Sequence, residues 1–202
     1  MTRFSNVVRT GIVTGAGSGI GLEIALQLAL KNCRVVIICK TNEQCIKTIN
    51  YIQQKSGNKN VFGYAVDLSS QVQIKETAQK ICRDWDKIDF LINNAACVRS
   101  NFELTVDGIE MQFAVNHLAP FLLTHYLLPA IKQSSDGRII NVNSRAHSRG
   151  KMHFDDLFLK KKYSVTKAYN QSKLANMLFT NFLAQKLMQD KISVTAFHPG
   201  LV

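Results

Sequence analysis

Three tyrosines in this sequence are followed by a lysine four residues later, and the pairs are Tyr51–Lys55, Tyr163–Lys167 and Tyr169–Lys173. Side chains four residues apart lie one turn from each other on the same face of a helix. A lysine ammonium in that position stabilises the phenolate and so lowers the pKa of a phenol. Such a pair can move a proton near neutral pH, where a free tyrosine with a pKa of about 10 is a poor base. Because the spacing also recurs by chance, the surrounding residues must select the pair.

The residues after Tyr169 favour the pair Tyr169–Lys173. They form a helical apolar pattern, which predicts that this pair is held rigidly against the core. The members of the pattern are Leu174, Ala175, Met177, Leu178, Phe179 and Phe182. Tyr163 follows three lysines inside a polar, irregular connector at residues 145–162, so we expect it to be held less firmly. Tyr51 lies in a polar segment, where a surface pair without a function is expected.

Strand-like and helix-like segments alternate along the whole chain. The expected strands are residues 10–15, 34–39, 61–67, 88–95, 137–144 and 192–197, and the expected helices are residues 20–31, from about 42, 70–85, about 106–128 and about 166–189. Strands that are apolar on both faces and alternate with helices predict a parallel sheet covered on both sides. The predicted fold class is therefore α/β, a doubly wound parallel sheet of Rossmann type with three α/β/α layers. Ligands of such a sheet bind at the carboxyl ends of the strands.

A glycine-rich turn, TGAGSGIG at residues 14–21, joins the first expected strand to the first expected helix. Its pattern is Thr-Gly-x-x-x-Gly-x-Gly, which is neither Gly-x-Gly-x-x-Gly nor a P-loop. The glycines allow positive φ angles, leave no Cβ in the path of a diphosphate, and let helix N–H groups point at the anion. The turn therefore predicts a dinucleotide site, and a plain tight turn is the weaker explanation.

The end of the second expected strand indicates which dinucleotide binds. An acidic residue at this point binds the 2′-hydroxyl of NAD, whereas a basic residue accommodates the 2′-phosphate of NADP. Lys40 occupies this point, and the next carboxylate is Glu43, so NADP(H) is favoured over NAD(H). Asp67, at the end of the third strand, is a candidate acceptor for the adenine amino group. Alternatively it caps the following helix, a role that Ser69 or Ser70 can also fill.

Several short segments occur in a fixed order: TGAGSGIG, DL at 67–68, NNAA at 93–96, Asn116, NVNS ending at Ser144, AYNQSK and HPG. This ordered set resembles the short-chain dehydrogenase/reductase family over nearly the whole chain. Within that family, VNHLAPFLLT, AYNQSKLANMLFT and FHPG are most similar to the retinol-dehydrogenase-like branch. The resemblance implies an oxidoreductase that interconverts an alcohol and a carbonyl by hydride transfer to or from NADP(H). A retinoid, steroid or lipid aldehyde is the implied substrate class.

The resemblance also implies the site residues. The catalytic residues would be Asn116, Ser144, Tyr169 and Lys173. The coenzyme-binding residues would be Gly15, Ser18, Gly19, Ile20, Gly21, Lys40, Asp67, Leu68, Asn94, Ala95, Tyr169, Lys173, Pro199 and Gly200. Tyr169 would be the proton-transfer group, Lys173 would also hold the nicotinamide ribose, and Ser144 would donate a hydrogen bond to the substrate oxygen. A turn residue at the strand end is the alternative for Ser144.

Asn116 has a physical reason of its own for a role in the site. Pro120, four residues later, has no N–H, so the carbonyl of Asn116 loses its helical donor and must find another. We expect a water linked to Lys173 to fill that place, giving a relay that returns protons to Tyr169. A kink that serves only packing is the alternative. The branch usually has Gly-His where this chain has Ala119-Pro120, so the relay is either strengthened or distorted here.

Two further departures concern single side chains. Ala96 replaces a usual glycine of the family, which adds a methyl group behind the nicotinamide. Asn143 replaces a common serine, which leaves Ser144 as the one clear hydroxyl at this strand end.

Composition excludes several other kinds of protein. The net charge is +11, but the basic residues are dispersed, and no basic stripe interleaved with aromatics predicts specific nucleic-acid binding. The five cysteines form no Cys-x-x-Cys pair, which favours reduced thiols, and the five scattered histidines give no metal motif. No apolar run reaches the roughly 18 residues of a membrane helix, and the opening ten residues lack the apolar core of a signal peptide. We expect a cytoplasmic protein, at most peripheral at a membrane surface, and a homodimer remains open.

The family normally continues past the Pro-Gly of HPGLV with a substrate-covering segment, a seventh strand and a helix. Residues 1–202 are therefore expected to be a single dinucleotide-binding domain without that segment: a fragment, a short isoform or a chain with little catalysis. Three functions stay open: the oxidoreductase, a non-catalytic dinucleotide-binding or interaction module, and a basic protein that binds nucleic acid with little specificity.

Overall fold

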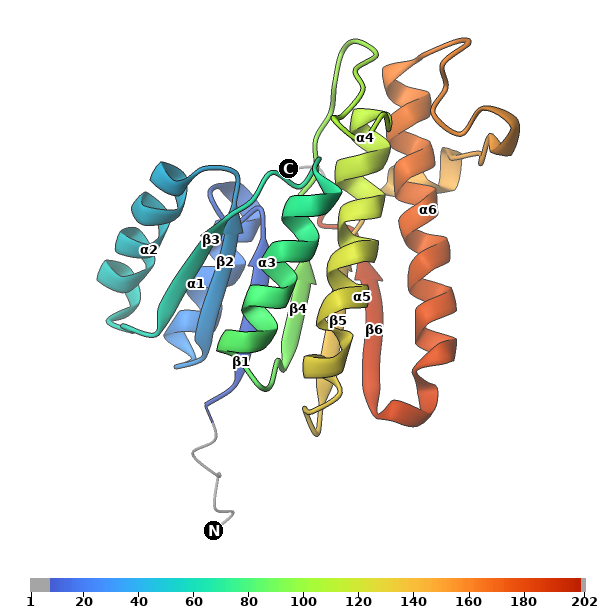
Figure 1. The fold of residues 1–202 in the computed structure, drawn as a ribbon. Coiled ribbons are helices and arrows are strands. Elements are labelled where there is room, and N and C mark those ends of the chain that lie inside the picture. Colours follow the sequence, from blue (N-terminus) through green and yellow to red (C-terminus); the bar gives the residue numbers. More distant parts are fainter. Residues whose placement is uncertain (1–7, 201–202) are drawn as a thin grey trace.

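The fold is a six-stranded parallel sheet with helices on both faces, as the sequence predicts (Figure 1). The computed structural model describes residues 8–200, so seven of the ten opening residues considered for a signal peptide and the last two residues of HPGLV lie outside the described part. The strands are β1 Thr10–Thr14, β2 Arg34–Cys39, β3 Val61–Ala65, β4 Phe90–Asn93, β5 Gly137–Val142 and β6 Ile192–Phe197. Their order is β3-β2-β1-β4-β5-β6, and every neighbouring pair is parallel.

The helices are α1 Gly19–Leu30, α2 Asn42–Ser56, α3 Gln71–Asp84, α4 Met111–Phe113, α5 Ala119–Ile131 and α6 Val165–Lys186. A π-helical segment, Ala114–Leu118, joins α4 to α5, and short 3-10 turns occur at Arg145–Arg149, Phe154–Asp156 and Met188–Asp190. None of the helices in the described part of the chain is long and apolar enough to cross a membrane.

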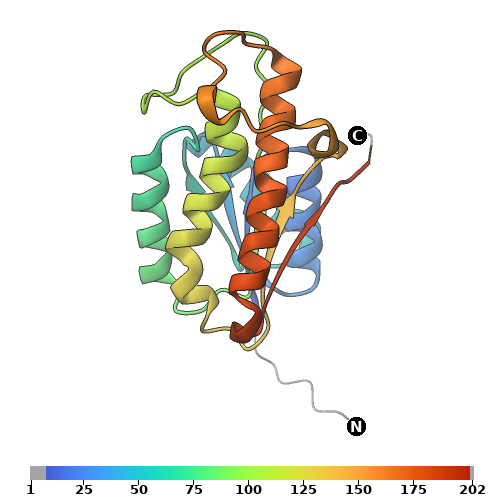
Figure 2. The same ribbon diagram turned by 90° about the vertical axis from the view of Figure 1, so that its right-hand side faces the viewer.

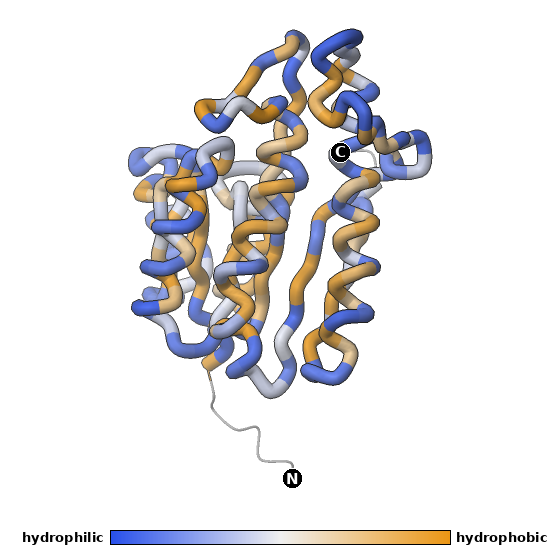
Figure 3. Tube along the Cα trace, turned by 45° about the vertical axis from the view of Figure 1, so that its right-hand side comes forward, coloured by the Kyte–Doolittle hydropathy of each residue, from blue (hydrophilic) through white to orange (hydrophobic). Residues whose placement is uncertain are grey.

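Two apolar clusters hold the helices against the sheet. One joins side chains of α3, α5 and α6 to one face, around Ile12, Leu91 and Ile139. The other joins α1 and α2 to the opposite face, around Val13 and Ile37. Figure 2 shows α3, α5 and α6 on one side of the sheet and α1 on the other, and in Figure 3 the strands are mostly apolar while polar residues mark the outer helix faces. Burial on both faces is the reason that the strands carry continuous β-branched runs.

The order of the strands positions a ligand site. The chain moves outward from β1 to β3 and then returns to the other side of β1 to form β4. The connections after β1 and β4 therefore leave in opposite directions, which opens a crevice at the carboxyl ends of these two strands. The glycine-rich turn follows β1, and the NNAA segment begins at the last residue of β4.

Two details of the expected elements are wrong. The helix expected from about residue 106 begins at Met111, because Gly108 turns the chain with a φ of 72° and Glu110 caps the helix through the N–H groups of Gln112 and Phe113. In α6, Ala175 and Phe179 are buried as expected, but Leu178 and Phe182 are 50% and 63% exposed.

Candidate active site

The glycine-rich turn has the backbone that the sequence predicts. Gly15 and Gly19 have φ angles of 65° and 54°, a region that glycine enters at little cost. A Cβ on Gly21 would lie 2.4 Å from the carbonyl oxygen of Gly15, so the turn has no room for a side chain there. The side chain of Ser18, the N-cap of α1, makes no capping hydrogen bond within residues 8–200. The first N–H groups of α1 can therefore bind an anion.

A cavity of about 490 Å³ lies next to this turn, at the carboxyl ends of the first four strands. It is lined by nine of the predicted coenzyme-binding residues: Gly15, Ser18, Ile20, Gly21, Lys40, Asp67, Leu68, Asn94 and Ala95. The other five, Gly19, Tyr169, Lys173, Pro199 and Gly200, are not among the described residues that line it. The cavity thus has the lining that the sequence predicts for the adenosine and diphosphate part of a dinucleotide site.

Thr14 ties the two sides of the crevice together. Its Oγ1 accepts hydrogen bonds from the backbone N–H groups of Asn94 and Ala95, each at 2.9 Å. The side-chain amide of Asn94 donates in turn to the carbonyl oxygens of Thr14, at 2.9 Å, and Gly15, at 3.3 Å. These bonds fix the segment after β4 against the glycine-rich turn. The predicted binding residue Asn94 therefore uses its side chain to build the cavity wall.

Asp67 and Lys40 face the same cavity from neighbouring strand ends. Oδ1 of Asp67 accepts hydrogen bonds from the N–H and the hydroxyl of Ser69, at 2.9 Å and 2.7 Å. Burial raises the pKa of the Asp67 carboxyl, but these bonds and the charges of Lys40 and Arg99 outweigh it and lower the pKa overall. Asp67 is thus an anionic acceptor, while Ser70 is the N-cap of α3.

Lys173 is buried at the carboxyl end of β5. Its side chain is 3% exposed, and its Nζ donates to the carbonyl oxygen of Val142 at 3.1 Å. Burial lowers the pKa of this ammonium to about 8. The Nζ also lies 5.6 Å from the centroid of the Tyr169 ring, one turn earlier on α6. The Lys173 ammonium therefore lies near the Tyr169 ring and is bound to Val142, which is two residues before Ser144 in the chain.

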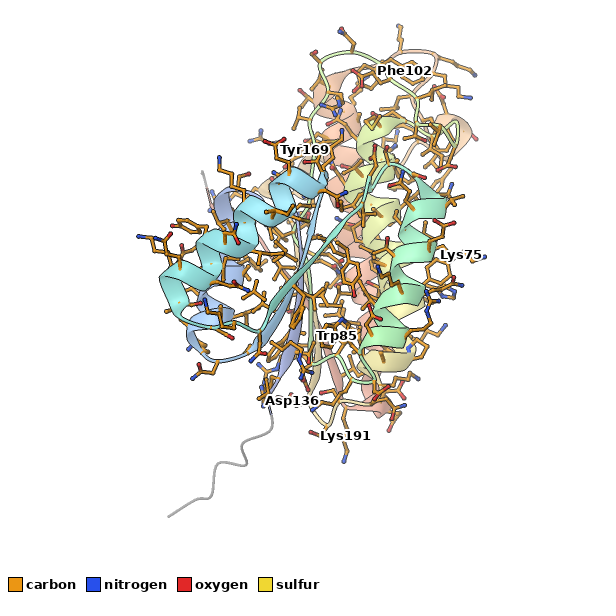
Figure 4. The ribbon with its side chains drawn as sticks, turned by 60° about the vertical axis from the view of Figure 1, so that its left-hand side comes forward. Lys75, Trp85, Phe102, Asp136, Tyr169 and Lys191 are labelled. Carbon is orange, nitrogen blue, oxygen red and sulfur yellow. The ribbon has the colours of Figure 1, made fainter. Side chains whose placement is uncertain are left out.

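Figure 4 shows where Tyr169 lies relative to the sheet. The label of Tyr169 is at the same end of the molecule as Phe102, whereas Asp136 and Lys191, which flank the starts of β5 and β6, are at the opposite end. Tyr169 thus lies at the carboxyl end of the sheet, where a doubly wound fold binds its ligands.

Asn116 is joined to the same turn of α6. Its Nδ2 donates to Oγ of Ser172 at 3.1 Å and to the carbonyl of Cys97 at 3.0 Å, and its Oδ1 accepts the N–H of Cys97 at 2.7 Å. Ser172 Oγ donates to the carbonyl oxygen of Tyr169 at 2.8 Å. One buried amide therefore connects the segment after β4 with the helix that carries Tyr169 and Lys173.

The carbonyl of Asn116 has a different donor from the one expected. The side-chain amide of Asn176 donates to it at 2.6 Å, while Lys173 donates to Val142. Asn176 thus supplies the donor that the missing N–H of Pro120 calls for, which was not identified from the sequence, and the water linked to Lys173 stays a prediction. Asn176 lies nearly two turns beyond Tyr169 on α6 and also contacts Nδ1 of His117, at 3.2 Å.

Ser144 lies two residues beyond the end of β5 and is the N-cap of the 3-10 turn Arg145–Arg149. Its Oγ accepts the N–H of Ala146 at 3.2 Å, which is the structural role considered as the alternative. Because the oxygen accepts in this contact, the hydroxyl proton remains a donor for a ligand. Both roles are therefore compatible at this position.

Tyr163 is held by hydrogen bonds, contrary to expectation. Its hydroxyl accepts from Nε2 of Gln112 at 2.8 Å and donates to the carbonyl of Arg99 at 3.0 Å. Burial, together with the nearby carboxylate of Glu110, raises the pKa of this phenol. A raised pKa is the opposite of what proton transfer near neutral pH needs. Tyr51, in α2, is exposed as expected.

Several residues that form hydrogen bonds with the predicted site residues were not identified from the sequence. Ser172 and Asn176 lie on the buried face of α6, and Thr14 ends β1. The cavity wall also includes Gly17, Gln44, Ala96, Cys97, Arg99, Met111 and Val115, which were not predicted to bind. A polar residue at an apolar helix position, such as Asn176, is the one signal that could have identified a member of this group.

The residues present fit a dinucleotide. The turn excludes a Cβ at Gly21, the first N–H groups of α1 are available, and the cavity carries a carboxylate at Asp67 and a cation at Lys40. In the described residues no cluster of three His, Cys, Asp or Glu side chains could hold a metal ion.

Comparison with known proteins assigns this arrangement to one family. A model of the family described as short chain dehydrogenase matches residues 9–202. The chain is 43% identical to human retinol dehydrogenase 13 over 194 residues, which cover 96% of this chain and 59% of that protein. It is 41% identical to human retinol dehydrogenase 11, covering 95% of this chain and 60% of that protein. The chain thus spans about 60% of the length of these relatives.

Solved structures show the same architecture. A protein from Mycobacterium paratuberculosis superposes with a TM-score of 0.84 and 33% identity, covering 95% of this chain and 68% of the other. A metagenomic short-chain oxidoreductase, solved in complex with NADP, gives a TM-score of 0.77 and 27% identity, covering 96% and 83%.

Proposed function

Because this chain belongs to the short-chain dehydrogenase family, an oxidoreductase family by resemblance, we propose that it interconverts an alcohol and a carbonyl on an apolar substrate with NADP(H). The observation that carries this proposal is the contact of Lys173 Nζ with the carbonyl of Val142, at 3.1 Å. This contact holds the ammonium at the end of β5, and the centroid of the Tyr169 ring lies 5.6 Å from the same Nζ, which supports the proposal.

Each of the residues has a defined task. A bound nicotinamide supplies or accepts the hydride. Tyr169 transfers the proton at the substrate oxygen, and the Lys173 ammonium stabilises the phenolate. Ser144 donates its hydroxyl proton to the same oxygen and stabilises the charge that develops there. Asn116 positions the turn of α6 that carries Tyr169, through Ser172.

NADP(H) is the proposed coenzyme. Lys40 follows β2, lines the cavity and offers a cation to a 2′-phosphate. The Asp67 carboxylate, with one oxygen held by Ser69, has a second oxygen for the adenine amino group. The metagenomic relative in complex with NADP supports this choice. Lys40→Ala should weaken NADPH about tenfold more than NADH, and equal losses would contradict a 2′-phosphate contact.

Retinal and simple aldehydes are the substrates to try, because the similar relatives are retinol dehydrogenases.

A homodimer is also part of the proposal, because α5 and α6 carry exposed apolar side chains that a second copy could cover. These side chains are Phe121 on α5 and Leu178 and Phe182 on α6, and the Phe121 ring lies 5.3 Å from that of Phe179. We also propose peripheral contact with a membrane surface, because an apolar substrate is found there.

A non-catalytic dinucleotide-binding module is the second candidate. It is favoured by the lining of the cavity, which includes Gly15, Lys40 and Asp67 but, among the described residues, neither Tyr169 nor Lys173. Tight NADPH binding without turnover of any aldehyde would support this alternative.

The test combines fluorescence titration of NADPH with turnover of retinal and simple aldehydes. Tyr169→Phe should lower turnover by a factor of about 10² to 10⁴ while NADPH affinity changes by less than about threefold. Tyr163→Phe is the matched control and should retain turnover, because its hydroxyl is engaged with Gln112 and Arg99. Turnover that survives in Tyr169→Phe and disappears in Tyr163→Phe would overturn the assignment.

A further inference from the structure

The side chain of Gln44 lies at the junction of the coenzyme cavity and a second cavity. Gln44 is in the first turn of α2, where its N–H donates to Oγ1 of the N-cap Thr41 at 3.2 Å. Its Oε1 accepts the backbone N–H of Lys40 at 3.2 Å. Thr and Gln at this spacing form a variant of the capping box, in which each end of the pair satisfies a backbone N–H. The Oε1 of Gln44 is therefore used, and its Nε2 is the end that faces outward from α2.

The Nε2 of Gln44 lies over the glycine-rich turn. A Cβ added to Gly17 would be 2.1 Å from this nitrogen, so the amide rests where any other residue at position 17 would place its side chain. The cavity of about 490 Å³ and the second one, of about 370 Å³, share only Gly17 and Gln44 among the described residues that line them. Gln44 therefore separates the two cavities, with its donor next to the turn that we expect to hold the diphosphate.

The charges around Gln44 differ between the two sides. Lys40 lines the first cavity, and its backbone N–H is the one bound by Gln44. Glu43 and Lys47 line the second cavity. A phosphate on the first side thus meets the Lys40 cation and the Gln44 N–H donors without facing the Glu43 carboxylate. An anion on the second side would lie beside that carboxylate, which disfavours it.

We propose that Gln44 is a specificity-determining residue that donates Nε2–H to the 2′-phosphate of NADP(H), on the first side of the partition between Gly17 and Lys40. This inference rests on the NADP(H) preference proposed above. It assigns the polar recognition of the phosphate to two side chains, a cation from the end of β2 and a neutral donor from the first turn of α2. Hydrogen bonds to a charged group are stronger than neutral ones, so one such donor is sufficient to change coenzyme preference measurably.

The discriminating variant is Gln44→Glu. Glutamate preserves the acceptor for the Lys40 N–H and is equally suited to a capping box, so a purely capping role predicts unchanged coenzyme affinity and an unchanged or higher melting temperature. The proposal instead predicts that NADPH affinity falls by about 10- to 100-fold, because a donor is lost and a negative charge faces the phosphate. NADH affinity should stay constant or rise, since a carboxylate at this point can accept from the 2′-hydroxyl.

Two further variants remove the remaining ambiguity. Asn42→Asp adds the same charge in the same helical turn but lines neither cavity, and it should change NADPH affinity by less than about threefold. Gln44→Met removes the donor, together with the Oε1 acceptor of the Lys40 N–H, without adding a charge, and it should weaken NADPH by about tenfold while NADH is unaffected. Affinities are measured by coenzyme fluorescence and folding by circular dichroism, so no readout depends on turnover.

The outcomes separate this inference from the proposed function. Wild-type chain that binds NADPH no more tightly than NADH overturns both. A wild-type preference for NADPH that is lost in Lys40→Ala but kept in Gln44→Glu and Gln44→Met overturns the role of Gln44 alone. Equal losses in Gln44→Glu and Asn42→Asp also overturn it, because they indicate a general effect of charge.

Discussion

Replacing Lys173 should stabilise the chain while abolishing its chemistry. The Lys173 side chain is 3% exposed, and its hydrogen-bond partner in the described residues is the neutral carbonyl of Val142. A buried ammonium without a carboxylate partner is costly, because the carbonyl replaces only part of its hydration. Lys173→Met keeps most of the side-chain volume and removes the charge. We therefore expect the variant to be more stable than the wild type at pH 7, in the absence of coenzyme.

The size of the effect follows from the pKa of the Lys173 ammonium. Burial lowers this pKa from 10.5 to about 8, and a shift of this size corresponds to about 3 kcal/mol. Loss of the hydrogen bond to Val142 returns about 1 kcal/mol of that, which leaves a net gain of about 2 kcal/mol. For a chain of this length the melting temperature should rise by about 4–8 °C.

The dependence on pH gives the sharper test. Between pH 8 and 10.5 the unfolded chain holds a proton on Lys173 that the folded chain has released. The wild type therefore gains stability as the pH rises through this window, and the penalty is fully present below pH 8. The difference between Lys173→Met and wild type should thus be largest at pH 7 and shrink towards zero near pH 10.5.

Urea denaturation at several pH values between 7 and 10.5 measures this difference. Lys167→Met, on an exposed position of the same helix, is the matched control and should leave stability unchanged at every pH. A Lys173→Met variant that is less stable at pH 7, or one whose difference from wild type is constant with pH, would show that burial of the charge does not dominate. Turnover should be lost in Lys173→Met in either case.

Three other substitutions test the surrounding geometry. Gly21→Ala places a Cβ 2.4 Å from the carbonyl oxygen of Gly15, so it should cost about 1–3 kcal/mol in a thermal melt and abolish measurable NADPH binding. Asn176→Leu leaves the carbonyl of Asn116 without its donor and should cost about 1–3 kcal/mol in urea denaturation; a neutral result would mean that another donor replaces the amide. Thr41→Ala removes the N-cap of α2 and should cost about 1 kcal/mol by the same measurement, whereas an unchanged midpoint would show that the cap contributes little.

The strands and the glycine-rich turn could be predicted because their signals are local. Continuous β-branched runs such as β2 are typical of strands covered on both faces, and the Gly-rich pattern signals a turn whose backbone, at Gly15, leaves no room for a Cβ at position 21. The start of the helix near residue 111 could not be predicted in the same way. Val106 and Ile109 have helical spacing, but Oγ1 of Thr105 accepts the N–H groups of Asp107 and Ile109 and stabilises a turn instead. Apolar periodicity does not detect such side-chain competition.

The apolar pattern of α6 shows a second limit. Leu178 and Phe182 have the same helical spacing as Ala175 and Phe179, yet only the second pair is buried. Helical spacing identifies residues that share a face of the helix. It does not show which of two apolar faces packs against the sheet. The pattern selected Tyr169 as part of a helix but could not show which stripe faces the core.

The donor for the Asn116 carbonyl shows why residue chemistry is easier to predict than residue partners. Pro120 removes an N–H, and this fact alone requires a substitute donor near residue 116. The identity of the donor depends on which part of α6 crosses the π-helical segment, and that crossing is set by packing of two helices distant in the sequence. Here Asn176 supplies the donor at 2.6 Å and leaves Lys173 to bind Val142. Asn176 and Lys173 therefore bind two different carbonyls, Lys173 lies near Tyr169, and a water relay from the Asn116 carbonyl stays a prediction.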